Sequence, residues 1–360
     1  MKIKKLLLLF FVVLIIGVGF LFSQRFHPAI YSKMGWLYGK EIGVTETTNL
    51  EGTAILASEF NHENLVYYSS MGLHLSPKKV QEMHLITPQM MSNGDYFLVY
   101  DRGGKTASVY YKNKELYTVS SKHDIQNAKV NDCGYLVLIS DQPGYQAIVS
   151  VYNRKGKNIY KVYSGEKYVL DADIHENGKR LAISQYATSG DELMSYVAFY
   201  HLDEREPYQV SESSETVFAA IKFLKNGKLL TVGETQTAAF SSNGEEDWRY
   251  EYVDGTLQTF SVSNYGVALV LGQQNQKVVL LNNNGKIHEY IHQGGDITQI
   301  TNNKSGVLFA ANREVFFLNK QAYLLANLQV ARDISELYLE ETGKNGVIRY
   351  EAGYDKIKVK

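Results

Sequence analysis

A sequence pattern made of a turn, a glycine and a buried apolar run recurs seven times along this chain. The glycine stands next to apolar stretches such as YFLVY, YLVLI, KRLAI and KLLTV, and the seven glycines are Gly94, Gly134, Gly178, Gly227, Gly266, Gly306 and Gly346. Successive glycines are 40, 44, 49, 39, 40 and 40 residues apart. A repeat of this length that contains only strand patterns is typical of a β-propeller.

Each period contains four strand patterns. The first alternates apolar and polar residues, as in 125–132 and 169–176, and predicts an innermost strand with one covered face. The second follows the glycine and is apolar at nearly every position, which indicates a strand buried on both faces between stacked sheets. The third is another apolar run. The fourth follows an Asn-Gly or Asn-x-Gly-Lys hairpin and is polar and aromatic, as expected for an outer edge.

The two ends of the repeat decide the number of blades. Residues 52–76 form a shorter set of strands before the first clear period, and residues 334–360 supply only three strands after the last one. A ring must close, so the segment around residues 42–48 is predicted to add the missing outer strand. The sequence therefore predicts an all-β, eight-bladed propeller over residues 42–360. Seven blades is the alternative, if the short first set is not a separate blade.

An apolar segment precedes the propeller. Residues 6–22 contain no polar side chain, and as a helix they would extend about 25 Å, near the lower limit for crossing a bilayer. Lys2, Lys4 and Lys5 precede this segment and only Arg25 follows closely, which predicts a cytoplasmic tail (1–5), a transmembrane helix (6–22), a juxtamembrane linker (23–41) and a propeller outside the cell membrane. A cleaved signal peptide is the alternative. We favour a signal-anchor, because the apolar core is long and no Ala-x-Ala site follows it.

Charge and cysteine content exclude some functions. Without the first 25 residues the chain has 33 basic and 38 acidic side chains, a net charge of −5. A nucleic-acid-binding domain would be expected to carry an excess of basic side chains. The single cysteine, Cys133, excludes an intrachain disulfide and a cysteine-based metal cluster. Tyrosine is abundant, with 27 residues against two tryptophans, and aromatic side chains suit strands.

Few residues suggest catalysis or metal binding. Asp171, Asp173 and His175 alternate along 169–176, so they share a face and are weak metal candidates on the channel wall, where plain solvation is the default interpretation. His288 and His292 would be about 13 Å apart on a strand, too far for one ion. The chain contains no Gly-x-Ser-x-Gly, phosphate-binding loop or His-Glu-x-x-His motif, and no cofactor is predicted.

Loop lengths suggest where a ligand binds. The middle hairpin loops and the links between blades vary in length and lie at the same end of a propeller, and binding residues collect on such loops. Arg102, Tyr145, Tyr186 and Gln274 are the predicted contacts at this end. The longest insertion, at 185–195, accounts for most of the 49-residue period.

The hairpin phrase Asn-x-Gly-Lys followed by aromatic residues, as in 153–160, 243–248 and 283–290, resembles quinoprotein-dehydrogenase-like and WD40-like β-propellers. That group includes cofactor enzymes and non-enzymatic outer-membrane assembly factors, and the resemblance covers residues 50–360. The chain lacks the paired cysteines and the regular docking tryptophan of the enzymes. Only Trp248 occupies such a place, which argues against a quinone cofactor. The anchor with eight short blades also resembles an uncharacterised family of membrane-anchored propellers from Gram-positive bacteria, which implies no activity.

These observations favour a binding or scaffolding module over an enzyme, with a protein or a cell-envelope polymer as its partner and the membrane as its anchor. One alternative is an enzyme acting on cell-envelope carbohydrate, which predicts carboxylates about 5–10 Å apart at the loop-rich end. The other is a sensor or assembly factor that docks a membrane partner, which predicts an exposed apolar patch near the anchor or at one end of the ring.

Overall fold

The computed structural model describes residues 41–50, 54–61, 64–76, 78–190, 192–253, 255–341 and 343–360. The predicted tail, the predicted membrane helix and all but the last residue of the predicted linker lie outside the described residues. Within the described ranges, no helix is long and apolar enough to cross a membrane.

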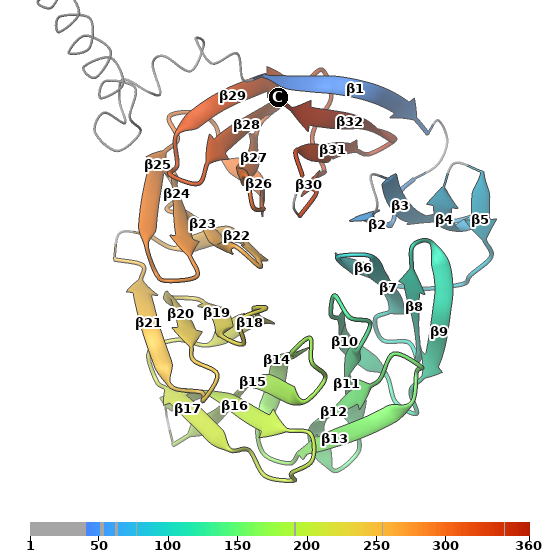
Figure 1. Cartoon of the computed structure of the whole chain (residues 1–360), viewed down its shortest axis with the longest axis vertical. Helices are drawn as coiled ribbons and strands as arrows, with labels where there is room; N and C mark the ends of the chain where they lie inside the picture. The colour runs from blue at the N-terminus through green and yellow to red at the C-terminus, as the bar shows by residue number, and fades with distance from the viewer. Residues whose placement is uncertain are drawn as a thin grey trace, which may run out of the picture.

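Eight four-stranded antiparallel sheets stand in a ring around a central axis (Figure 1), so the predicted eight-bladed propeller is confirmed and the seven-bladed alternative is wrong.

We number the blades along the chain. Blades 1 to 4 consist of β2 (Ala57–Asn61), β3 (Asn64–Ser69), β4 (Gly72–Ser76) and β5 (Lys79–Gln81); β6 (Pro88–Asn93), β7 (Tyr96–Asp101), β8 (Thr106–Tyr111) and β9 (Lys114–Ser120); β10 (Ile125–Val130), β11 (Leu136–Gln142), β12 (Tyr145–Tyr152) and β13 (Asn158–Ser164); and β14 (Tyr168–Ile174), β15 (Arg180–Ser189), β16 (Glu192–His201) and β17 (Gln209–Ser213). Blades 5 to 8 consist of β18 (Phe218–Phe223), β19 (Leu229–Gly233), β20 (Gln236–Phe240) and β21 (Glu246–Glu251); β22 (Leu257–Ser263), β23 (Gly266–Leu271), β24 (Lys277–Asn282) and β25 (Ile287–Ile291); β26 (Ile297–Asn302), β27 (Gly306–Ala311), β28 (Glu314–Asn319) and β29 (Leu324–Gln329); and β30 (Glu336–Leu339), β31 (Asn345–Tyr350), β32 (Gly353–Val359) and β1 (Ile42–Asn49).

Blade 8 combines both ends of the propeller sequence. Strand β1 pairs antiparallel with β32, from Ile42 opposite Val359 to Asn49 opposite Gly353. Arg332, in the link before β30, adds a second connection, because its guanidinium donates to the Asn49 side chain at 3.0 Å and pairs with Asp355 of β32 at 3.2 Å. The ring is therefore closed by hydrogen bonds between segments about 300 residues apart in sequence.

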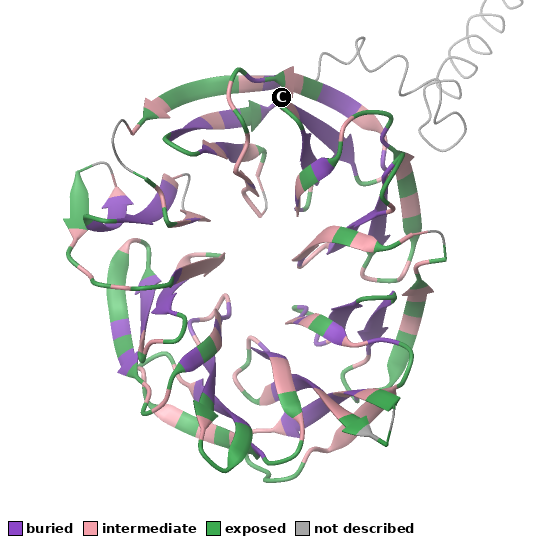
Figure 2. Cartoon of the chain, turned by 180° about the vertical axis from the view of Figure 1, so that it is seen from behind, coloured by how far each residue is buried: buried purple, intermediate pink, exposed green. Residues whose placement is uncertain are grey.

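Burial follows the position of a strand within its blade (Figure 2). The second strands, such as β23 and β27, are buried at every residue, because neighbouring blades cover both faces. The innermost strands alternate, as β10 and β18 show, and the outer strands β21 and β25 are exposed at every second residue. These patterns match the strand order within each period that the sequence indicates.

The ring has two different ends. At the turn end, short turns join the first strand to the second and the third to the fourth. At the loop end lie the hairpins between second and third strands and the links between blades. One expectation at the loop end is wrong: residues 185–195 are not a loop, because β15 and β16 continue to a tight turn and Ser189 pairs with Glu192. In blade 1, the first strand begins only at Ala57, and the three-residue β5 supplies an outer strand that the sequence pattern did not reveal.

At three of the recurrent glycines, Gly134, Gly178 and Gly227, the preceding blade packs directly against the turn. Gly178 has φ +66°, and a Cβ atom there would lie 2.3 Å from the ring of Tyr135 in the blade before. Gly134, with φ +81°, meets the ring of Tyr96 in the same way, at 2.5 Å. Only glycine combines this backbone conformation with so close an approach. At Gly266, Gly306 and Gly346 a Cβ atom would instead meet a backbone carbonyl of the same blade, so close packing within or between blades requires the glycine.

Aromatic side chains also form hydrogen bonds across these seams. The outer-strand side chains Tyr117, Tyr160 and Trp248 each donate a hydrogen bond to a backbone carbonyl of the next blade, namely those of Gly134 (2.9 Å), Glu204 (2.7 Å) and Asn283 (3.3 Å). A buried Tyr or Trp needs a partner for its polar atom, and the carbonyl of the next blade provides one. Tyrosine thus takes the docking role for which the sequence resemblance suggested tryptophan, and Trp248 has that role as expected.

Candidate functional site

A polar cavity of about 530 Å³ lies at the turn end, where the innermost strands meet their turns. Six of the eight blades contribute to its wall. Four carboxyl side chains line it, those of Glu59, Asp95, Glu340 and Glu341, and Lys222 is the only cation among its described lining residues. The wall is therefore acidic and rich in hydrogen-bonding groups. This is the opposite end from the one where the sequence placed the ligand contacts.

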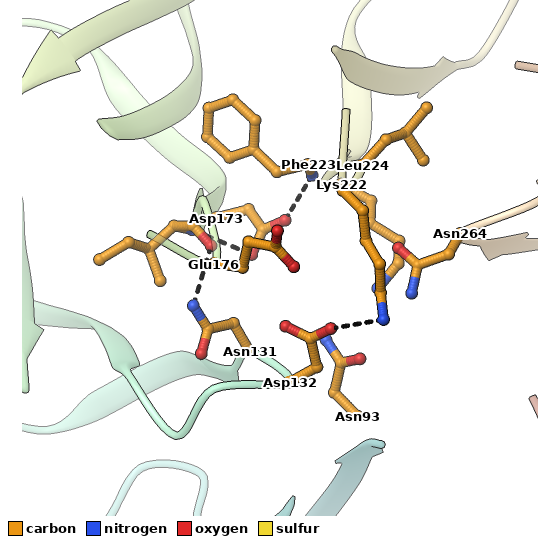
Figure 3. Close-up of a pocket in the computed structure, with 11 residues that line it drawn as sticks. Asn93, Asn131, Asp132, Asp173, Glu176, Lys222, Phe223, Leu224 and Asn264 are labelled. Atoms are coloured by element: carbon orange, nitrogen blue, oxygen red, sulfur yellow. Dashed lines mark hydrogen bonds and ion pairs between the residues drawn. The ribbon is translucent and has the colours of Figure 1, made fainter. Parts of the chain in front are cut away.

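A smaller hollow continues the polar surface beneath blades 3 to 5 (Figure 3). It shares Asn93, Lys222 and Asn264 with the larger cavity. Within it, Lys225 forms an ion pair with Asp132 at 3.1 Å across the gap between blades. Such partly exposed pairs contribute little to stability.

Turn asparagines hold this end of the ring together. The Asn131 side chain accepts hydrogen bonds from the backbone of its own turn, at Cys133 and Tyr135, and donates to the carbonyls of Ile174 and His175 in the next blade. Asn303 does the same between blade 7 and the Glu340 carbonyl of blade 8. The residues that present the acidic side chains are therefore locked by contacts between blades.

Glu59 has an unusual environment in this cavity. Its carboxyl accepts a hydrogen bond from Ser92 at 2.9 Å, which links the innermost strands of blades 1 and 2. Burial raises the pKa of Glu59 to about 8, the Ser92 hydrogen bond opposes this, and the nearby charge of Glu336 adds to it. The side chain is thus a carboxylic acid at neutral pH, able to donate a hydrogen bond into the cavity.

Glu336 lies beside Glu59 and remains ionised. Its carboxylate accepts hydrogen bonds from Ser58 at 2.8 Å and Arg349 at 2.7 Å, and from the hydroxyl of Tyr338. Burial acts against ionisation, but the hydrogen bonds from Arg349 and Tyr338 outweigh it and lower the pKa of Glu336. Two neighbouring carboxyls therefore hold opposite protonation states where blade 8 meets blade 1.

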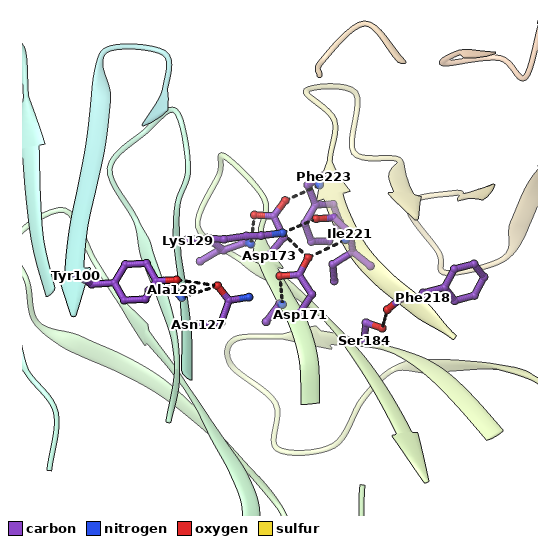
Figure 4. A network of polar contacts seen from close by, with 12 residues as sticks. Tyr100, Asn127, Ala128, Lys129, Asp171, Asp173, Ser184, Phe218, Ile221 and Phe223 are labelled. Atoms are coloured by element: carbon purple, nitrogen blue, oxygen red, sulfur yellow. Dashed lines mark hydrogen bonds and ion pairs between the residues drawn. The ribbon is translucent and has the colours of Figure 1, made fainter. Parts of the chain in front are cut away.

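The metal candidates Asp171, Asp173 and His175 serve a different purpose, which Figure 4 shows for the two aspartates. The two aspartates do share a face, but that face packs against blade 5, where Asp171 accepts the Ile221 N–H at 2.8 Å and Asp173 accepts the Phe223 N–H at 2.6 Å. Lys129 of blade 3 pairs with Asp171 and donates to the Ile221 carbonyl at 2.8 Å. Burial raises the pKa of Asp173, while the charges of Lys129 and Lys222 oppose that rise.

His175 packs its ring edge-on against Phe223, with centroids 5.6 Å apart. Among the described residues, no group of three or more His, Cys, Asp or Glu side chains is arranged to hold a metal ion. The trio is therefore a buried polar junction of three blades and not a solvated channel wall.

The four predicted contact residues lie on four different blades at the loop end. Arg102 and Gln274 are exposed loop residues. Tyr145 begins β12 and contacts Tyr163 at 5.1 Å between ring centroids, and Tyr186 lies within β15, stacked on Tyr168 at 5.1 Å. None of the four lines the polar cavity. Whether they bind a ligand stays a prediction.

Glu59, Glu340 and Glu341 were missed by the sequence reasoning. They lie on or just after innermost strands, close to the turns that begin the next strand. That position is a usable signal, because in a propeller the end of every innermost strand reaches the mouth of the channel. The variable loop lengths instead led to the prediction of ligand contacts at the loop end.

The closed ring of four-stranded sheets, docked by glycine turns and aromatic side chains, defines a β-propeller of eight blades. The chain belongs to a family of unknown function (DUF5711), whose profile matches residues 42–359. No curated protein matches the chain.

Solved structures support the same fold at low identity. The C-terminal WD40 domain of Sif2 is similar, with 13% identity and a TM-score of 0.64 over 89% of this chain and 99% of that one. BamB from Moraxella catarrhalis has 10% identity and a TM-score of 0.53, covering 88% and 99%, and Sqt1 from Saccharomyces cerevisiae has 11% identity and a TM-score of 0.56, covering 89% and 99%. The expected likeness to WD40-like propellers is confirmed for the fold. At these identities the likeness concerns the fold alone.

Proposed function

We propose that the protein is a membrane-anchored scaffold whose propeller, outside the cytoplasmic membrane, binds a protein partner with its loop end. The observation that carries this proposal is a group of exposed apolar side chains on blade 1. Leu56, Met71 and Ile86 are 56%, 60% and 93% exposed, and they stand before β2, between β3 and β4, and after β5. We call them the blade 1 patch.

The topology of the ring places these three side chains at the same end. The link before the first strand, the middle hairpin and the link after the fourth strand all lie at the loop end. Large apolar side chains exposed together on a rigid frame are typical of a site that another protein covers. The exposed tyrosines Tyr163 and Tyr168 lie at the same end of blades 3 and 4.

The direction of the tether supports this choice of end. The chain enters the propeller at Glu41, whose backbone carbonyl accepts the Lys360 N–H at 2.9 Å, at the turn end of blade 8. With residues 6–22 as the membrane anchor, the loop end is the one remote from the tether. A partner could therefore reach the blade 1 patch without displacing the linker. The resemblance to membrane-anchored propellers of Gram-positive bacteria agrees with this arrangement.

Replacing Met71 and Ile86 together by lysine is expected to abolish partner binding and leave the fold intact, because both side chains are exposed. The full chain and the variant are affinity-purified from detergent-solubilised membranes after cross-linking, and the co-purified proteins are compared. Replacing Ile159 and Ile287, exposed residues at the turn end, by lysine is the matched control. A partner kept by the control and lost by the patch variant supports the proposal. Identical sets for all three proteins, or recovery of the chain in the soluble fraction, would contradict it.

Hydrolysis of a cell-envelope carbohydrate is the second candidate, favoured by the acidic cavity in which Glu59 keeps its proton beside the ionised Glu336. Replacing Glu59 by glutamine is expected to stop turnover of peptidoglycan fragments by the full chain. In the wild type, the unfolded state ionises Glu59 above pH 4.5 but the folded state only near pH 8, so stability decreases between these values. The glutamine variant should lack that decrease, which separates loss of activity from loss of fold. Absence of turnover in the wild type, or equal turnover in the variant, rejects this candidate.

A further inference from the structure

The seam between blades 6 and 7 has a histidine at a position where two other seams have an aromatic docking residue. In blades 3 and 5, the docking residues Tyr160 and Trp248 pair with Val151 and Ala239 of the third strand. In blade 6 the corresponding third-strand residue, Leu280, pairs with His288. In blades 3 and 5 the pairing of the third and fourth strands shifts in register between the docking pair and the hairpin turn. In blade 6 the pairing has no such shift. His288 therefore occupies the ladder position of a docking tyrosine or tryptophan.

Space remains beside the imidazole in this seam. A cavity of about 280 Å³ lies between blades 6 and 7 at the turn end, and His288 forms part of its wall. Its apolar floor is made by Val267, Leu280 and Val307. This volume corresponds to roughly nine water molecules at their liquid volume, so a compact organic molecule fits.

The rim of the cavity is basic. Lys286 and Lys320 come from the turns that join the third strand to the fourth in blades 6 and 7. No acidic side chain is among the described lining residues. Within the described part of the chain neither ammonium group has an ion-pair partner, nor does the His288 ring have a hydrogen-bond partner. Burial, followed by the charge of Lys286, lowers the pKa of His288, so its ring is neutral at neutral pH and can donate one hydrogen bond. Two cations and a donor above an apolar floor match an anion that has an apolar body.

We propose that the seam between blades 6 and 7 is a binding site for a small organic anion, a carboxylate or a phosphate monoester with an apolar group. The acidic group lies between Lys286 and Lys320, within reach of His288, and the apolar group lies on Leu280 and Val307. Charge-assisted hydrogen bonds to the lysines supply the selectivity for an anion, and burial of the apolar group supplies part of the affinity. This site is independent of the proposed partner surface, which is at the loop end.

The test uses four probes with one aromatic ring each and the full chain in detergent. Benzoate and phenyl phosphate are the anions, benzyl alcohol is neutral and benzylamine is a cation. Binding is measured by ligand-observed NMR at millimolar concentration, with the shift in unfolding temperature as a second measurement. The two anions are expected to bind, and the stronger of them identifies the acidic group that the site prefers. The neutral and cationic probes are expected to show no saturable binding.

Two variants locate the binding. Replacing Lys286 and Lys320 together by glutamine should weaken binding of the anions by about tenfold or more, since each charged hydrogen bond contributes about 1.5–3 kcal/mol. Both lysines are exposed, so the fold should be unaffected. Replacing His288 by tryptophan should fill the cavity, abolish binding and leave the unfolding temperature equal to or higher than that of the wild type. His84→Trp, at an exposed histidine in the link of blade 1, is the control and should bind as the wild type does.

Three results would overturn the site: no saturable binding of either anion, equal binding of benzyl alcohol and phenyl phosphate, or unchanged anion binding in the lysine double variant. If the tryptophan variant failed to fold, the lysine variant would still decide the question. Loss of the protein partner in the blade 1 variant with intact anion binding would separate failure of one proposal from failure of the other.

Discussion

Replacing Asp171 by alanine is expected to lower the free energy of unfolding by about 3–5 kcal/mol. The Asp171 carboxylate is 3% exposed and accepts the N–H groups of Ala172 at 2.9 Å and Ile221 at 2.8 Å, besides pairing with Lys129. Alanine would leave the Ile221 N–H without its acceptor and the Lys129 ammonium group without its counter-charge. Both groups are inside the junction of three blades, where unpaired polar groups are most costly.

The measurement is denaturant unfolding of the full chain in detergent, followed by tryptophan fluorescence. Asp203→Ala, at an exposed aspartate in the same blade, is the control and should stay within about 0.5 kcal/mol of the wild type. Lys129→Met combined with Asp171→Leu should recover part of the loss, because removing both charges avoids an unpaired one while the Ile221 N–H still lacks its acceptor. If Asp171→Ala were as stable as the control, the contacts of Asp171 at the three-blade junction would not stabilise the fold as its geometry indicates.

Deleting residues 42–49 is expected to open the ring. Blade 8 would retain β30, β31 and β32, and the edge of β32 would lose partners from Val359 to Gly353. Ile42, which is 5% exposed and packs with Val330 and Val359, would be lost from the core of that blade. Several ladder hydrogen bonds at about 0.5–1.5 kcal/mol each, with the apolar burial, approach the whole net stability of a folded domain.

Thermal unfolding and hydrogen exchange of the anchored chain measure this effect. Amides of β31 and β32 should lose protection first, whereas those of blades 3 to 5 should keep it. Thr45→Ala, at an exposed position of the same strand, is the control and should unfold like the wild type. A synthetic peptide of residues 41–50 added in trans should restore part of the stability by strand addition. Unchanged unfolding of the deletion variant would show that the ring does not depend on this closure.

Most of the fold could be predicted because its signals are local. A strand buried on both faces is apolar throughout, an innermost strand alternates, and a docking turn needs glycine, so each blade is recognisable within forty residues. The three-strand count at the C-terminus pointed to a fourth strand from the other end of the chain. Two errors have local causes as well: β5 is too short to have a pattern, and the hairpin at 185–195 resembles a loop because polar residues occupy a strand extension that projects beyond the blade.

The candidate sites depended on contacts between blades. Alternation placed Asp171 and Asp173 on one face, but only packing decided that blade 5, and not solvent, covers that face. The acidic cavity arises where side chains from six blades converge, which no single repeat encodes. The same holds for the seam at His288, because a cavity is the difference between the space that two backbones leave and the volume of the side chains that fill it. The sequence alone determined the ring and its closing strand, since these follow from patterns within each repeat and from the strand count at its two ends, whereas the structure decided between eight blades and seven. The positions of the cavities and the protonation of Glu59 were decided by distances between repeats, which only the tertiary structure sets.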